Sequence, residues 1–276
     1  MDTSRYDIVV GVDGSDSALR AADWATAEAR RHTGASLTIV LINDDPARES
    51  YAREAVADIA GRCGEAQPSL EVSHEVAEGH PIEELVRRSS TADLLVLGSR
   101  GYGPVADALL GSVSVGVARR TRCPIVVVRG DESEHRDEVV VGVDDSARSE
   151  AALEFGFTRA RNRASELLVM RAMSRNSRTR QPTSRRESPS GRVEHDLAKR
   201  LERWGAWFPE VTARRIDVEK HPVTALLELS KGAGLVVVGR RGGGGFSGLM
   251  LGSVARGVLH RASCPVAMVP EAGEQE

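Results

Sequence analysis

The stretch ADLLVLGSRGYGPVADALLGSVSVGVARRTRCPIVVV, residues 92–128, decides the fold because a similar copy follows it later in the chain. The copy, AGLVVVGRRGGGGFSGLMLGSVARGVLHRASCPVAMV, occupies residues 233–269 and aligns without a gap. A shorter segment, IVVGVDGSDSALRAADWA at residues 8–25, likewise returns as VVVGVDDSARSEAALEFG at residues 139–156. Self-similarity of this kind predicts a structural unit repeated in tandem.

The repeat divides the 276 residues into a first domain at 1–131 and a second at 132–276. The opening segments are offset by 131 residues and the closing segments by 141, so the second copy has about ten extra residues. We place them in the Arg/Ser/Pro-rich stretch at residues 174–192. This insert has too little apolar content to fold alone, and we expect a mobile, solvated loop. A basic contact for RNA or an acidic partner, or a phosphorylation site, is the alternative interpretation.

Each copy alternates short Val/Ile/Leu runs with segments of helical periodicity. The strand candidates of the first copy are IVVGV, LTIVLI, LEVSHEV, DLLVLG and PIVVVR. Such alternation predicts an α/β fold in which helices cover both faces of a parallel sheet. We therefore expect two tandem, doubly wound domains.

The composition is that of a globular protein, with 41% hydrophobic and 28% charged residues. A formal net charge of −3 provides no general attraction to nucleic acid or to an anionic membrane, so nucleic acid is not an expected partner. The chain shows no signal-like start and no apolar run long enough to span a bilayer, which favours a cytoplasmic location. The three cysteines lack metal-like spacing, and we expect reduced, buried thiols rather than a redox pair.

Glycines after the fourth strand of each copy form the main candidate site. The first copy has Gly98-x-x-Gly101, nine residues, and then Gly111-Ser112 at the start of a helical pattern. Glycine lets main-chain N–H groups approach an anion, and a helix start adds uncapped N–H groups and the positive end of the helix dipole. The second copy repeats the spacing, so the pattern predicts a cradle for a polyphosphate in each domain. The alternative is that these glycines only make turns.

An aspartate ends the first strand of each copy, Asp13 in the first and Asp144 in the second. Ligands of doubly wound sheets bind beyond the carboxyl ends of the strands, where the winding reverses, so these carboxylates are expected to face the glycine loops. A carboxylate there suits a ribose hydroxyl, an adenine amino group or Mg²⁺. A helix N-cap is the alternative role, but Ser15 and Ser146 are equally suited to capping.

The pattern G-x₂-G-x₉-G-S after a strand, with V-D-G-S near the start and C-P-V-V-V-like endings, resembles the ATP-binding branch of the universal stress protein family over nearly the whole chain. The resemblance implies five parallel strands per domain, as in adenine nucleotide alpha hydrolase-like folds, and ATP, with Mg²⁺ as an accompanying ion, at the switch point. It also implies that the closing strands at residues 125–129 and 266–269 pair between the domains. The chain would then be an intramolecular pseudo-dimer, and further homo-oligomerisation stays open.

The resemblance also carries over nucleotide-binding residues, position by position. In the first domain these residues are Asp13, Ile42, Leu97, Gly98, Arg100, Gly101, Gly111, Ser112, Val113 and Ser114. In the second domain they are Asp144, Ala172, Val238, Gly239, Arg241, Gly242, Gly252, Ser253 and Val254. The assignment of Ala172 as the equivalent of Ile42 is uncertain by one residue.

The second site departs from the first at two positions. Asp145 replaces Gly14 and adds a negative charge, and Ala255 replaces Ser114 and removes a hydroxyl. A lost hydrogen bond weakens binding by about 1 kcal/mol. We therefore expect the first site to bind ATP more tightly and the second site to be weaker or empty.

The function expected from these features is that of a nucleotide-binding regulator in the stress response. A slow ATPase is an alternative, although the lysines Lys199, Lys220 and Lys231 all lie outside the glycine loops. His80 and His221 each precede a proline at matched positions, where we favour a role at a helix start. A scaffold with vestigial nucleotide sites is the third interpretation.

Overall fold

The computed structural model describes residues 5–101, 110–130, 137–144, 146–173, 189–242 and 251–271. Strands and helices alternate in both halves, as the sequence predicts. The elements of the first half are β1 (Tyr6–Val12), α1 (Asp16–Ala29), β2 (Ala35–Asn43), a short 3₁₀ helix (Pro46–Arg48), α2 (Glu49–Ala66), β3 (Glu71–Glu78), α3 (Pro81–Arg88), β4 (Leu94–Gly98), α4 (Ser112–Arg120) and β5 (Ile125–Val128).

The second half repeats this order. Its elements are β6 (Val139–Val143), α5 (Ser149–Arg163), β7 (Leu167–Ala172), α6 (Pro189–Trp207), β8 (Ala213–Val218), α7 (Pro222–Leu229), β9 (Leu235–Gly239), α8 (Ser253–Arg261) and β10 (Val266–Val269).

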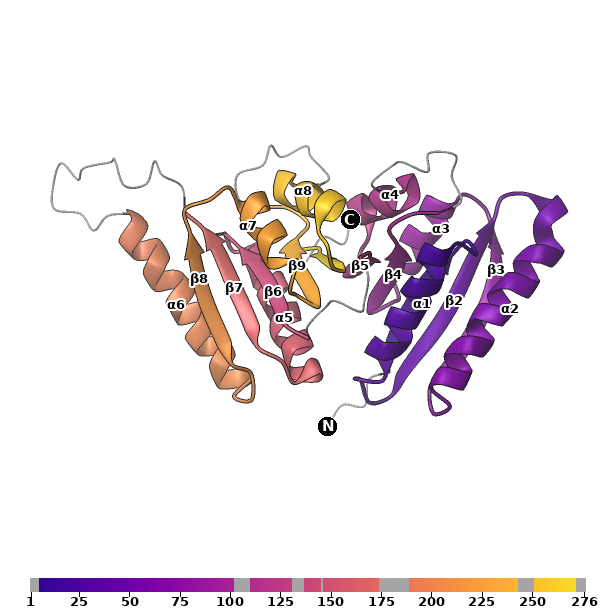
Figure 1. Ribbon diagram of the computed structural model, residues 1–276, viewed down its shortest axis with the longest axis horizontal. Helices are drawn as coiled ribbons and strands as arrows, with labels where there is room; N and C mark the ends of the chain where they lie inside the picture. Colours follow the sequence, from indigo (N-terminus) through magenta and orange to yellow (C-terminus); the bar gives the residue numbers. More distant parts are fainter. Residues whose placement is uncertain are drawn as a thin grey trace.

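All ten strands form one sheet, in the order β3-β2-β1-β4-β5-β10-β9-β6-β7-β8. The strands within each half are parallel, and the two halves join through the antiparallel pair β5–β10. In this pair Val126 lies opposite Ala267. The expected doubly wound α/β fold and the expected pairing of the closing strands are both confirmed. In Figure 1 the junction lies at the centre of the molecule, between the first half, coloured indigo to magenta, and the second half, coloured rose to yellow.

Two apolar cores lie on opposite faces of the sheet, and each extends through both halves. One core packs α1, α2, α5 and α6 against the sheet, and it includes the aromatic residues Trp24, Phe157 and Trp204. The other packs α3, α4, α7 and α8 on the opposite face. Strands buried on both faces need apolar residues at nearly every position, which explains the unbroken Val/Ile/Leu runs in the sequence.

The expected loop at residues 174–192 is wrong at its last four residues, because α6 already begins at Pro189. Proline is favoured in the first turn of a helix, where its missing N–H leaves no hydrogen bond unmade. The rest of the insert, residues 174–188, lies outside the described residues.

Candidate functional site

The end of β1 and the loop after β4 meet in the first domain. Strand β1 pairs directly with β4, so Gly11 lies beside Leu97, and Asp13 follows one residue after β1 ends. Gly101 lies so close that a Cβ atom there would overlap the Oδ2 atom of Asp13. The predicted approach of the first-strand aspartate to the glycine loop is therefore present in the structure.

Asp13 does not cap the first helix. Its Oδ1 atom accepts a hydrogen bond from the Ser15 amide at 3.0 Å. Ser15 is the N-cap of α1, and its hydroxyl oxygen accepts from the Ala18 amide at 3.2 Å. Capping by Ser15 leaves the exposed Asp13 carboxylate at the mouth of the loop, as the sequence predicts.

The glycine loop is held by two hydrogen bonds from main-chain amides. The Gly111 amide donates to the Ser99 carbonyl at 2.7 Å and joins the two ends of the loop, and the Arg100 amide donates to the Ser17 hydroxyl of α1 at 3.2 Å. A Cβ atom at Gly98 would lie 2.6 Å from the Ser17 carbonyl oxygen, so only glycine fits at the end of β4. The intervening residues 102–109 lie outside the described residues.

Helix α4 points its N-terminus at this loop. Gly111 is its N-cap and supplies no side-chain hydrogen bond to the first turn. The side chain of Ser112 is exposed there, and Val113 is half-buried. N–H groups of an uncapped first turn are directed outward and carry the positive end of the helix dipole, which favours an anion.

Ser114 has a role that the sequence analysis did not identify. Its hydroxyl is buried and donates to the Gly98 carbonyl at 2.7 Å. This hydrogen bond ties the first turn of α4 to the end of β4. Ser114 thus stabilises the start of the glycine loop through a buried hydrogen bond on the side away from solvent.

Ile42 and Leu97 flank the site from β2 and β4, the strands on either side of β1. Ile42 lies near the end of β2 and is half-buried against the core beneath α3 and α4. Leu97 is 3% exposed, so its side chain backs the site from within that same core.

The sheet register removes the uncertainty over Ala172. Leu41 lies opposite Val12 in the first domain, and Arg171 lies opposite the equivalent Val143 in the second. Ile42 and Ala172, which follow these residues, therefore occupy equivalent positions.

The second domain brings the same elements together. Asp144 follows β6, and a Cβ atom at Gly242 would lie 2.8 Å from its Oδ2 atom. The Gly252 amide donates to the Arg240 carbonyl at 2.9 Å, and Gly252 is the N-cap of α8 without a side-chain hydrogen bond. The remaining predicted residues, Val238, Gly239, Arg241, Ser253 and Val254, lie along the end of β9, its loop and the first turn of α8.

Two serines donate hydrogen bonds to Asp144, which the sequence analysis did not predict. Its Oδ1 atom accepts from the hydroxyls of Ser146 at 2.5 Å and Ser149 at 2.8 Å, as well as from the Ser146 amide. The prediction that Ser146 is suited to cap the helix is wrong, because α5 begins later, with Arg148 at the N-cap position. Its hydroxyl serves the aspartate instead. Asp145 lies outside the described residues.

Sequence reasoning also missed Arg148. Its Nη1 atom lies 3.5 Å from the Gly242 carbonyl, and its Nε atom lies 2.8 Å from a carboxylate oxygen of Glu271. The repeat aligns Arg148 with Ser17, so an arginine replacing a small residue at a helix start was the available signal. The second site therefore has a cation and a carboxylate at its rim.

The remaining candidates have structural roles in this fold. His80 and His221 are the N-cap residues of α3 and α7, which confirms their expected position at helix starts. Cys63, Cys123 and Cys264 are buried free thiols, as expected. Within the described ranges, no group of three or more His, Cys, Asp or Glu residues is arranged to hold a metal ion. No helix in that part of the chain is long and apolar enough to cross a membrane.

The fold and the paired glycine loops define a tandem, doubly wound α/β protein with one candidate anion-binding site per half. The model of the universal stress protein family matches residues 6–129 and again residues 135–270. This chain belongs to the universal stress protein family.

Known relatives agree in length and in fold. A universal stress protein of Mycobacterium tuberculosis is 34% identical over 95% of this chain and 96% of its own length. One of Mycolicibacterium smegmatis is 33% identical over 96% of this chain and 97% of its own length. The crystal structure of a universal stress protein from Archaeoglobus fulgidus covers 96% of this chain and 98% of its own, with a TM-score of 0.68 and 20% identity. The last likeness concerns the fold alone.

Proposed function

We propose that this chain binds ATP, with Mg²⁺ as an accompanying ion, and acts as a nucleotide-dependent regulator in the stress response. The proposal rests on three features that come together at the carboxyl ends of the strands of the first domain. They are the Asp13 carboxylate, the loop beginning at Gly98, and the uncapped N-terminus of α4.

The residues fit a nucleotide by their chemistry. Gly101 lets the loop approach the Asp13 carboxylate, because a Cβ atom there would overlap Oδ2, and Gly111 places no side chain over the first-turn amides of α4. These amides suit the negatively charged phosphates, while the carboxylate suits the hydroxyls of the ribose. The apolar side of Ile42 suits the face of a base. Mg²⁺ prefers carboxylate and phosphate oxygens, which the aspartate and the nucleotide would together supply.

The two sites differ in ways that favour tighter binding at the first. Asp144 already accepts two serine hydroxyls, and Ser149, one of the donors, aligns with Ala18 in the first domain. A ligand hydroxyl must compete with these internal donors. Ala255 also lacks the hydroxyl with which Ser114 ties the loop in the first domain.

Regulation is favoured over efficient catalysis. Phosphoryl transfer enzymes place a lysine on the phosphates and a positioned base beside the attacking water. Lys220 instead pairs with Glu228 at 2.6 Å, beyond the end of β8. Slow ATP hydrolysis remains the alternative activity, and release of inorganic phosphate from ATP distinguishes it from binding alone.

The decisive experiment is calorimetric titration of Mg·ATP into nucleotide-stripped protein. We expect two binding events of unequal affinity, with the tighter event in the first domain. No binding up to millimolar ATP would reject the proposal and leave the scaffold interpretation.

A further inference from the structure

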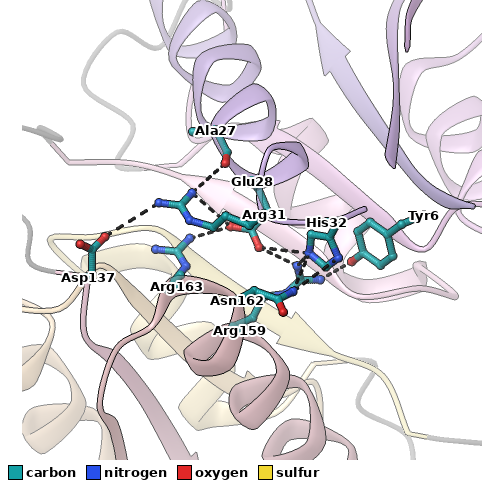
Figure 2. Close-up of polar contacts among 9 residues, drawn as sticks. All are labelled: Tyr6, Ala27, Glu28, Arg31, His32, Asp137, Arg159, Asn162 and Arg163. Carbon is teal, nitrogen blue, oxygen red and sulfur yellow. Dashed lines mark hydrogen bonds and ion pairs between the residues drawn. The ribbon is translucent and has the colours of Figure 1, made fainter. Parts of the chain in front are cut away.

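A cluster of charged side chains is buried where α1 of the first domain meets α5 of the second (Figure 2). At its centre the Glu28 side chain is 0% exposed and the Arg159 side chain is 2% exposed. The Arg159 Nη1 atom lies 2.6 Å from Glu28 Oε1, and Arg163 Nη2 lies 2.9 Å from Glu28 Oε2. One carboxylate therefore receives two arginines from the other domain.

Further groups of the first domain enclose Arg159. Its guanidinium donates to the Tyr6 hydroxyl and lies against the His32 ring nitrogen. Tyr6 and His32 stack with ring centroids 4.0 Å apart. Asn162 contacts the His32 ring from the second domain, at 3.1 Å (Figure 2). The arginine thus fits into a polar pocket made largely by the opposite domain.

The 131-residue offset between the repeats aligns Glu28 with Arg159. The two residues are thus equivalent positions of the two domains, and they contact each other directly. In a symmetric pair of identical domains, a residue on the two-fold axis meets its own copy. This chain has opposite charges at that one position.

The sheet junction by itself cannot tell one domain from the other. Strand β5 reads IVVV and β10 reads VAMV, and every residue of both is buried. Apolar strands of this kind would pair about as well with a copy of themselves. The discrimination between partners has to come from another part of the interface.

We propose that the opposite charges at Glu28 and Arg159 make the first domain pair only with a second domain, and so keep the two halves of the chain from pairing with their own kind in another chain. A pair of second domains would bring Arg159 and Arg163 from each copy to one buried place. A pair of first domains would leave each Glu28 with only the groups of its own domain, such as Arg31 at 3.9 Å and His32 at 3.6 Å.

Partner choice explains this cluster better than stability does. Taking charges out of water costs so much that an apolar pair of similar size is often as stable as a buried ion pair. Leaving a buried charge without its partner, in contrast, is strongly destabilising. A buried ion pair therefore penalises wrong pairings more than it stabilises the right one.

The test uses full-length chains with two different affinity tags, coexpressed in pairs. Glu28→Arg and Arg159→Glu each place like charges at the centre of the intrachain interface. Coexpressed, the two variants can restore opposite charges only between chains, because each first domain then finds a complementary second domain in its partner. We expect them to copurify as a dimer of twice the chain mass, several-fold more than two differently tagged wild-type chains.

Controls separate pairing from folding. Two differently tagged Glu28→Arg chains should not copurify above the wild-type background. The exposed pair Glu49–Arg53 on α2, 2.6 Å apart, provides the matched control, because its complementary reversals lie away from the interface. A chain that carries both Glu28→Arg and Arg159→Glu should copurify with a differently tagged copy of itself no more than wild-type chains do, and it should unfold at a higher temperature than either single variant.

Two results would overturn the proposal. One is that the complementary variants copurify no more than wild-type chains do. The other is that the chain with both reversals unfolds at the same temperature as the less stable single variant.

Discussion

Ser114 and Ala255 occupy equivalent positions, and one hydroxyl distinguishes them. The Ser114 hydroxyl ties α4 to the Gly98 carbonyl in the first domain. Removing it with Ser114→Ala should destabilise the protein by about 1 kcal/mol, because a buried hydrogen bond is lost. Urea unfolding measures the change. Ser112→Ala, on the exposed side of the same turn, is the control and should leave stability unchanged.

Gly111 permits a direct test of the first nucleotide site. Its φ of −71° suits any residue, and a Cβ atom would find its nearest neighbour, the Ser99 carbonyl oxygen, at 3.5 Å. Gly111→Leu should therefore fold while its side chain blocks the N-terminus of α4. We expect it to remove the tighter ATP-binding event in calorimetry, whereas Gly252→Leu removes the weaker one. Loss of the tighter event in Gly252→Leu alone would contradict the proposed order of affinities.

The thiols should be unreactive in the folded protein. Burial raises the pKa of Cys123 and of Cys264 to about 12, and burial also raises the pKa of Cys63. Because the thiolate is the reactive form, a disulfide reagent at pH 8 should modify these cysteines only after unfolding. Fast modification of the native protein would show that the interior opens readily.

At the scale of elements, glycines of two helices should respond oppositely to the same substitution. Gly61 is an exposed residue of α2, and a Cβ atom there would contact nothing within 4 Å. Gly61→Ala should stabilise the protein by about 0.5–1 kcal/mol, because glycine loses more backbone entropy in a helix. A Cβ atom at Gly156 of α5 would overlap Val141 of β6, so Gly156→Ala should destabilise it. Thermal unfolding of both variants checks the signs, and a gain for Gly156→Ala would contradict this packing.

Helix starts show the limit of local sequence signals. Ser15 and Ser146 align in the repeat and have the same side chain, yet only Ser15 caps its helix. The Ser146 hydroxyl bonds to Asp144 instead, together with Ser149, which replaces Ala18. The same residue type at the equivalent position therefore has a different hydrogen-bonding role in each domain.

For the whole molecule, the interdomain cluster predicts how stability depends on pH. Burial would raise the pKa of Glu28, but the hydrogen bond with His32 and the charges of Arg159 and Arg163 hold it well below its ordinary value of 4.5. A carboxyl group with a lowered folded-state pKa stabilises the protein above its unfolded pKa, and this contribution is lost as the pH falls. The thermal midpoint of the wild type should therefore fall more steeply below pH 4.5 than that of Glu28→Gln. Parallel pH profiles of the two proteins would contradict a charged Glu28.

The sequence by itself determined the tandem α/β fold and the contact, in each domain, between the end of the first strand and the glycine loop after the fourth. Both features depend on patterns within one repeat, such as the apolar run before Gly98 and the aspartate after β1. Parallel pairing of β1 with β4 brings the ends of these two strands to the same edge of the sheet. The family resemblance added the pairing of β5 with β10.

Only the tertiary structure decided which residues surround those features. The contact of Arg148 with the second loop, the engagement of Asp144 by Ser149, and the ion pair of Glu28 with Arg159 join side chains of separate elements. Local periodicity does not encode such contacts, because they depend on how helices rotate and pack over the sheet. In the sequence, an arginine aligned with a glutamate resembles an ordinary substitution between two exposed residues. Burial of both side chains at the domain interface makes the difference in charge a constraint on which domains can pair.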